Sequence, residues 1–145
     1  MLRKELLPKL FELIELSKKL NVDICFDAEE ADRLNLSLFM VEEILNSNFV
    51  DNNYSGFGIA VQAYQQRSIF VLKWLDNKLN KLKKKMNVRL VKGAYWDTEI
   101  KLAQEKGLKN YPVFTNKFIT DLSYLKCAHI LANSNNLFPQ FATHN

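Results

Sequence analysis

The sequence predicts an α/β fold with parallel strands. Four short apolar runs begin near residues 22, 57, 88 and 137, and a helical pattern fills each interval between them. Strands that alternate with helices in this way pair in parallel, and largely apolar strands are typical of a sheet covered on both faces. The chain has 145 residues, 48% of them hydrophobic and 25% charged, which is enough for a packed core.

Apolar residues at three- and four-residue steps predict five helices. These are expected at Leu2–Leu20, Ala28–Leu45, Ser68–Met86, Asp97–Lys106 and Thr115–Ala132. The strands are expected at Val22–Phe26, Phe57–Ala63, Val88–Val91 and Leu137–Ala142. Gly107 is a good residue to close the fourth helix, and Thr115 is the expected N-cap of the fifth.

Two architectures are compatible with this order, a doubly wound sheet and a (βα)8 barrel. No glycine-rich phosphate loop follows the first strand, which disfavours the doubly wound dinucleotide fold. Polar residues instead follow the strand ends, where a barrel gathers its active site. A complete barrel needs roughly 250 residues. We therefore expect a fragment of one, a single partial barrel domain over residues 1–145 with a leading helix at 1–20 and about four β-α units at 21–145.

Charge and cysteine content narrow the function classes. The net charge is +4, and the basic stretch Lys78–Lys85 spreads around a helix whose leucines face inward, so a solvated face is favoured over nucleic-acid binding. Cys25 and Cys127 do not complete a four-ligand zinc set, so no metal site is expected. The sequence shows no secretory signal or membrane-spanning run, and a reduced, cytoplasmic protein is the simplest interpretation.

The third strand carries a cation. Side chains alternate along a strand, so Arg89, Val91 and Gly93 share one face while Lys92 lies on the other. A charge inside a strand needs a partner. Either Arg89 forms a core ion pair with Asp27 or another acid, or it meets an anionic or electron-rich ligand inside a barrel.

Two small and two aromatic residues follow that strand. Gly93 and Ala94 are small enough for a flat ligand to approach the backbone, although a simple turn explains them equally well. Tyr95 and Trp96 offer stacking surface, and hydrophobic cover is the commoner role of such aromatics. On the preceding strand, Gln62 can donate to and accept from the edge of a heterocycle, or it can be satisfied by neighbouring backbone.

Polar residues also end the first and last strands. Asp27 is either an N-cap that Glu30 completes in a capping box or a carboxylate at the mouth of a barrel. His144 can donate from either ring nitrogen and suits a phosphate oxygen. Lys92 as a Schiff-base amine is a further alternative, which its position opposite the Arg89 face disfavours.

Six segments resemble those of one family and occur in the same order. They are DAEEADR, VQAYQ, VRLVKGAYWD, YPVFTNK, TDLSY and FPQFATHN, and the resemblance runs from about Val22 to Asn145. Together they are similar to the proline dehydrogenase domain of the bifunctional proline utilization A flavoenzymes. The resemblance implies a distorted (βα)8 barrel that binds FAD noncovalently and transfers a hydride from L-proline to flavin N5. The implied product is Δ1-pyrroline-5-carboxylate, with electrons passing to membrane quinone.

The resemblance also implies roles for individual residues. Arg89 would lie near flavin N5, and Asp27 and Tyr95 would line the proline pocket, which makes these three the expected catalytic residues. The expected FAD-binding residues, which also include Arg89, are Gln62, Val91, Gly93, Ala94, Trp96, Thr115, Lys117, Thr143, His144 and Asn145. Asn116 stands where such proteins usually carry a basic residue, which weakens the case for one phosphate contact.

Parts of the family's site have no counterpart in the sequence. These are an earlier strand with an active-site lysine, a late helix whose arginine pair clamps the proline carboxylate, and the aldehyde dehydrogenase domain. Two interpretations stay open. One is an enzyme fragment whose open sheet edges favour self-association or a complementing barrel half; the other is a catalytically inactive remnant. In the complete enzyme, the passage of electrons to quinone implies a peripheral position at the inner membrane.

Overall fold

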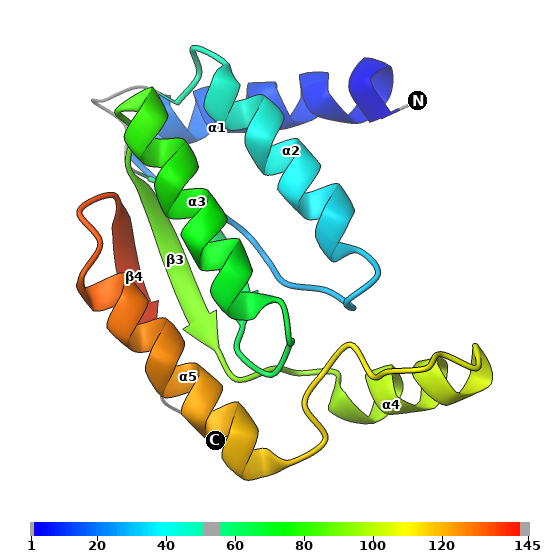
Figure 1. Ribbon diagram of the computed structural model, residues 1–145. Coiled ribbons are helices and arrows are strands. Elements are labelled where there is room, and N and C mark those ends of the chain that lie inside the picture. The colour runs from blue at the N-terminus through cyan, green and yellow to red at the C-terminus, as the bar shows by residue number, and fades with distance from the viewer. Residues whose placement is uncertain (1, 51–55, 143–145) are drawn as a thin grey trace.

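The computed structural model describes residues 2–50 and 56–142. Helices and strands alternate along most of this chain (Figure 1). The helices are η1 (Leu2–Leu6, a π-helix), α1 (Leu7–Leu20), α2 (Leu34–Asn46), α3 (Ser68–Leu82), α4 (Trp96–Glu105) and α5 (Lys117–Ala132). The strands are β1 (Ile24–Phe26), β2 (Phe57–Gln62), β3 (Met86–Val91) and β4 (Leu137–Phe141).

The four strands form one parallel sheet in the order β1-β2-β3-β4. Each strand therefore pairs with the one before it, whereas a doubly wound sheet reverses direction partway through its strand order. The strands of a (βα)8 barrel pair in the same sequential order. The prediction of an α/β partial barrel with parallel strands is therefore confirmed.

One face of the sheet packs against the helices. Phe57, Ile59 and Val61 of β2 alternate with residues of the opposite face, and all three belong to the main hydrophobic core. The core also contains Met86, Val88 and Leu90 of β3, Leu137 of β4, and buried residues of the helices: Ile14, Val41, Ile44, Leu45, Val71, Leu72, Leu75, Leu79, Cys127 and Leu131. In Figure 1, α1 crosses the end of the sheet at which β3 begins, and α4 lies beyond the end at which β3 finishes.

The opposite face of the sheet is more open. In β3, buried residues alternate with half-buried Asn87, Arg89 and Val91. The register places Ala60 beside Arg89 and Gln140 on its other side, so these residues form a row across three strands. The predicted alternation along β3, which separates Arg89 from Leu90, is confirmed by this burial pattern.

The helix expected from Ala28 is shorter than predicted. It begins at Leu34, with Arg33 in the N-cap position and no side-chain cap, so the capping box of Asp27 and Glu30 is wrong. The Asp27 carboxylate instead accepts a hydrogen bond of 2.9 Å from the neighbouring Ala28 N–H. Residues 28–33 form an irregular loop. Within it the Glu29 carbonyl accepts a hydrogen bond from Gln62, and the Ala31 N–H donates one to Glu99.

Other element ends also differ from expectation for local reasons. The α-helical hydrogen bonding of the leading helix begins at Leu7, next to Pro8, which lacks an N–H donor. Asn116, not Thr115, caps α5, because its side chain accepts a hydrogen bond from Phe118 N–H. Gly107, which follows the C-cap residue Lys106 of α4, has φ +59, and this fits its expected role in closing that helix. No described helix has the length and apolar character needed to cross a bilayer.

Candidate active site

An ion pair lies on the open face of the sheet near the carboxyl ends of the strands. Arg89 of β3 donates to Asp27, which follows β1, with 2.6 Å between Nη2 and Oδ1. The side chains are 37% and 77% exposed, so the expected partner is correct but the pair does not lie in the core. Arg89 Nε is buried and has no hydrogen-bond partner among the described residues. The guanidinium therefore keeps donor capacity that Asp27 does not use.

The turn after β3 packs closely against a tyrosine. Gly93 has φ +145, and a Cβ at this position would lie 2.4 Å from Cγ of Tyr64. Tyr64 follows β2 and is 2% exposed, and its burial raises the pKa of the phenol to about 12. Only glycine combines this backbone conformation with so close an approach to a ring. Gly93 is thus explained by both the turn and the packing.

A second set of contacts brings the loop before α5 to the same place. Phe114 N–H donates to the Tyr64 carbonyl at 2.8 Å, and Gln66 N–H donates to the Pro112 carbonyl at 3.1 Å. The indole N–H of Trp96 donates to the Phe114 carbonyl at 2.9 Å. Segments about fifty residues apart in sequence therefore lie side by side at the end of the sheet.

These contacts form a cleft of about 420 Å³. Four residues expected at the cofactor site line it, namely Gly93, Trp96, Thr115 and Lys117. The other lining residues are Tyr64, Lys92, Thr120 and Asp121. The cleft combines aromatic surface, a glycine backbone, hydroxyls and ammonium groups, a set that suits a flat ligand carrying an anionic tail.

Asp121 holds both lysines of the cleft. Its carboxylate lies 2.6 Å from Lys92 Nζ and 3.2 Å from Lys117 Nζ. Hydrogen bonds from Lys92 and then from Lys117 lower the pKa of this carboxyl below its ordinary value. Lys92 is thus engaged on the side of the sheet opposite Arg89, as alternation predicts, whereas the side chain of Lys117 remains 78% exposed.

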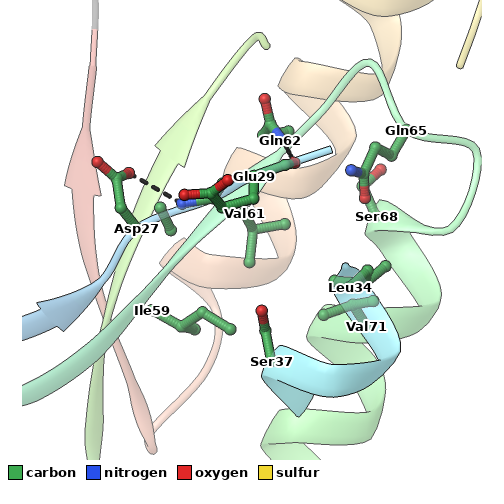
Figure 2. Close-up of a pocket in the computed structure, with 12 residues that line it drawn as sticks. Asp27, Glu29, Leu34, Ser37, Ile59, Val61, Gln62, Gln65, Ser68 and Val71 are labelled. Atoms are coloured by element: carbon green, nitrogen blue, oxygen red, sulfur yellow. Dashed lines mark hydrogen bonds between the residues drawn. The ribbon is translucent and has the colours of Figure 1, made fainter. Parts of the chain in front are cut away.

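Gln62 is satisfied by protein backbone. Its amide nitrogen donates to the Glu29 carbonyl at 2.8 Å, and its amide oxygen accepts from Ala94 N–H at 3.1 Å (Figure 2 shows the first contact). Gln62 is only 3% exposed. This is the buried-amide alternative. The second lone pair of the amide oxygen remains available, and the role of Gln62 toward a ligand stays a prediction.

The remaining expected site residues are dispersed around this end of the sheet. Val91 and Tyr95 are half-buried, and Ala94 is exposed. Thr143, His144 and Asn145, which were expected to contact the cofactor, lie outside the described residues.

Three residues of this region were missed by sequence reasoning. Tyr64 and Asp121 line the cleft, and nothing local to the sequence distinguishes them from a strand-end aromatic and a surface acid. Glu99 is 4% exposed on α4 and accepts a hydrogen bond from Ala31 N–H. It shares the buried side of α4 with Ala103, four residues on. An acid on that stripe is the sequence signal that identifies such a residue.

Sequential parallel strands with a polar cleft at their carboxyl ends define the site of a barrel-type α/β enzyme. The proline dehydrogenase family model matches residues 2–145. The chain belongs to this family, which confirms the resemblance noted in the sequence.

Several relatives show the same relationship. The bifunctional protein PutA of Klebsiella aerogenes is 46% identical over 143 residues, 98% of this chain and 11% of that protein. PutA of Escherichia coli K12 is 45% identical, also over 98% of this chain and 11% of that protein. The chain therefore spans about 11% of the length of these curated relatives.

Solved structures agree with the fold. A crystal structure of a proline utilization A (PutA) variant from Bradyrhizobium japonicum superposes with a TM-score of 0.94 and 49% identity over 99% of this chain and 15% of that one. PutA from Bdellovibrio bacteriovorus, inactivated by N-propargylglycine, gives a TM-score of 0.89 and 37% identity over 98% and 15%. The four strands and their helices thus correspond to part of the proline dehydrogenase barrel.

Proposed function

We propose that this chain carries part of an FAD-dependent proline dehydrogenase site that oxidises L-proline to Δ1-pyrroline-5-carboxylate, with quinone as the final acceptor. The observation that carries the proposal is the meeting of Gly93, Trp96, Thr115 and Lys117 in one cleft next to the strand that bears Arg89. The four residues expected to bind FAD come from the turn after β3 and from the start of α5. They are distant in sequence, and the fold brings them together.

The groups present fit a flavin dinucleotide. Gly93 is exposed and lines the cleft, and Trp96 is 42% exposed beside it. Lys117 and Thr115 supply a cation and a hydroxyl for phosphate oxygens. When bound, a flavin supplies the two-electron acceptor for a hydride from the proline ring carbon next to nitrogen. Arg89, with its unused donor, would hold an electron-rich ring edge.

Asp27 and Tyr95 would receive the substrate. The Asp27 carboxylate is 77% exposed and so is open to the cationic amine of proline. Tyr95 lies at the start of α4, where its ring and hydroxyl would cover the substrate ring. The Arg89–Asp27 pair keeps the carboxylate in place, and Asp27 would also accept the proton that the amine loses as the C=N bond forms.

The proposal is tested on the full chain after incubation with FAD. We expect a flavin absorbance band that stays with the protein through gel filtration, and proline-dependent reduction of an electron-accepting dye. N-propargylglycine, which inactivates PutA of Bdellovibrio bacteriovorus, should abolish this reduction with time. Bound flavin without turnover would support the inactive-remnant alternative, and the absence of flavin binding would refute the proposal.

A matched pair of variants locates the cofactor site. Lys117→Ala removes a cation from the cleft, whereas Lys109→Ala removes a lysine that does not line it. Loss of one phosphate contact should weaken FAD binding by about tenfold in the first variant and by less than about twofold in the second. Equal effects would place the cofactor elsewhere.

We also propose that the chain works with a second polypeptide surface. Among the described residues, β1 and β4 each have one neighbour in the sheet, which leaves an unpaired edge on each. Self-association or a complementing barrel half would cover these edges. Light scattering during gel filtration should report a mass above that of one chain; a stable monomer up to high concentration would contradict self-association. For the complete enzyme we propose a cytoplasmic location, peripheral to the inner membrane, which cell fractionation tests.

A further inference from the structure

A buried carboxylate of α4 reaches across to the loop that follows β1. Glu99 Oε1 accepts a hydrogen bond of 2.5 Å from Ala31 N–H, although the two residues are 68 positions apart. Glu99 is 4% exposed. An ionisable group is rarely buried to this extent unless it has a specific partner. The contact therefore needs an explanation beyond the packing of α4.

The two segments that Glu99 joins carry the two expected walls of the substrate pocket. Ala31 lies four residues after Asp27, in the irregular loop before α2. Tyr95 lies four residues before Glu99, one turn of helix away, and its carbonyl accepts a hydrogen bond from Glu99 N–H at 2.9 Å. Glu99 is therefore hydrogen-bonded both to Tyr95 and to the Asp27 loop.

Gln62 joins the same two segments a second time. Its amide bonds Glu29 of the Asp27 loop on one side and Ala94 of the Tyr95 turn on the other, and Figure 2 shows the amide beside Glu29. Two buried polar side chains thus bridge the loop and the turn, one from β2 and one from α4. These bridges also use backbone groups that an α-helix starting at Ala28 would need, which explains the late start of α2 at Leu34.

We propose that Glu99 is a positioning residue, whose carboxylate fixes the Asp27 loop relative to the Tyr95 turn so that the substrate pocket keeps its geometry. This inference rests on the proposed function of Asp27 and Tyr95. Glu99 does not line the cleft assigned to the cofactor, so its effect falls more on the substrate than on flavin affinity. Small displacements of substrate-contacting groups have large effects on rate.

The chain offers a matched control for this contact. Asp32 and Lys106 also join the Asp27 loop to the end of α4, through an ion pair of 3.4 Å whose side chains are 60% and 51% exposed. Exposed pairs of this kind contribute little. Asp32→Asn therefore removes a link between the same two segments without removing the buried one.

The test compares Glu99→Ala, Glu99→Gln and Asp32→Asn in the full chain loaded with FAD. Glu99→Ala should lower kcat/KM for proline by about tenfold or more, while the Kd for FAD should change by a clearly smaller factor. Glu99→Gln keeps an acceptor for Ala31 N–H and should recover most of the loss, and Asp32→Asn should resemble the unmodified chain. A value of kcat/KM that is unchanged in Glu99→Ala, or that falls by the same factor as FAD affinity, would overturn the proposal.

Hydrogen–deuterium exchange separates this proposal from the proposed function. In Glu99→Ala, exchange should accelerate by about tenfold in residues 28–33 and 93–97 and stay unchanged in β2 and α3. If the unmodified chain does not oxidise proline, the proposed function fails. The hydrogen–deuterium exchange of Glu99→Ala then still tests whether Glu99 holds the two segments in place. Exchange that is unchanged, or faster throughout the protein, would overturn it.

Discussion

β2 and β4 flank the same strand, β3, but they differ sharply in burial. All six residues of β2 are buried, whereas Leu137 is the only buried one of the five in β4. Composition does not explain this, because FGIAVQ and LFPQF are both largely apolar. The cause is the number of neighbours. β2 lies between β1 and β3, while β4 has a described neighbour on one side only.

The difference extends to the helix next to β4. On α5, Phe118, Leu122 and Leu125 follow one another at steps of four and three residues, and they are 82%, 67% and 67% exposed. Phe138 and Phe141 of β4 are 43% and 45% exposed. The side chains of β2 are therefore fully packed, whereas β4 and α5 expose apolar side chains that further protein can cover.

The largest expected effect comes from comparing one phenylalanine of each strand, Phe57 of β2 and Phe138 of β4. Phe57 of β2 is fully buried and packs edge-on against Phe26 at 5.7 Å between ring centroids. Phe57→Ala should lower the free energy of unfolding by about 3–5 kcal/mol. Phe138→Ala in β4 should cost roughly 1 kcal/mol or less, since that ring is already partly in water. Denaturant unfolding measures both, and equal losses would refute the contrast between the two strands.

A smaller effect is expected at the glycine of the cleft. Gly93→Ala places a methyl group against the ring of Tyr64 and strains a backbone at φ +145, so we expect a loss of about 2–3 kcal/mol. Gly107→Ala is the control, because its φ is +59 and no atom lies within 4 Å of a Cβ there. That substitution carries backbone strain alone and should cost about 1 kcal/mol. Thermal unfolding distinguishes the two, and similar shifts would mean that Tyr64 moves aside freely.

The open edge should change association more than stability. Leu122→Gln combined with Leu125→Gln should lower the average mass in light scattering if this row is the contact surface. The free energy of unfolding of the monomer should change by less than about 0.5 kcal/mol. Leu108→Gln, an exposed leucine outside α5, serves as the control and should leave the mass unaltered. A mass that is insensitive to the α5 double variant would assign any association to another surface.

The smallest effect is electrostatic and depends on pH. The pKa of Asp121 is lowered from its ordinary 3.8 by hydrogen bonds from Lys92 and Lys117. The stabilisation is therefore present above the ordinary pKa and is lost as the pH falls through the lowered value of the folded state. Asp121→Asn should remove this part of the pH dependence of the unfolding temperature. Glu105→Gln, which removes the exposed pair with Lys101, is the control; identical curves for both variants would contradict a specific role for Asp121.

The features that sequence reasoning predicted depend on periodicity. Alternation along β3 placed Arg89 and Lys92 on opposite faces, and the β-α repeat gave parallel strands. The irregular loop at residues 28–33 was missed because its conformation depends on Gln62 and Glu99, which are 33 and 68 residues from their partners. The cleft was predicted only as a set of residues. Its walls meet through backbone pairing between Tyr64 and Phe114, which local patterns do not encode.

The sequential strand order has a consequence for how the chain folds. Each new strand pairs with one that is already synthesised, so the sheet can grow in the direction of translation without waiting for a distant partner. The pairing of Met86 with Leu137 closes the longest loop, since α4, the long segment after it and α5 all intervene. β4 should therefore be the last strand to form and the first to exchange its amides in the native state.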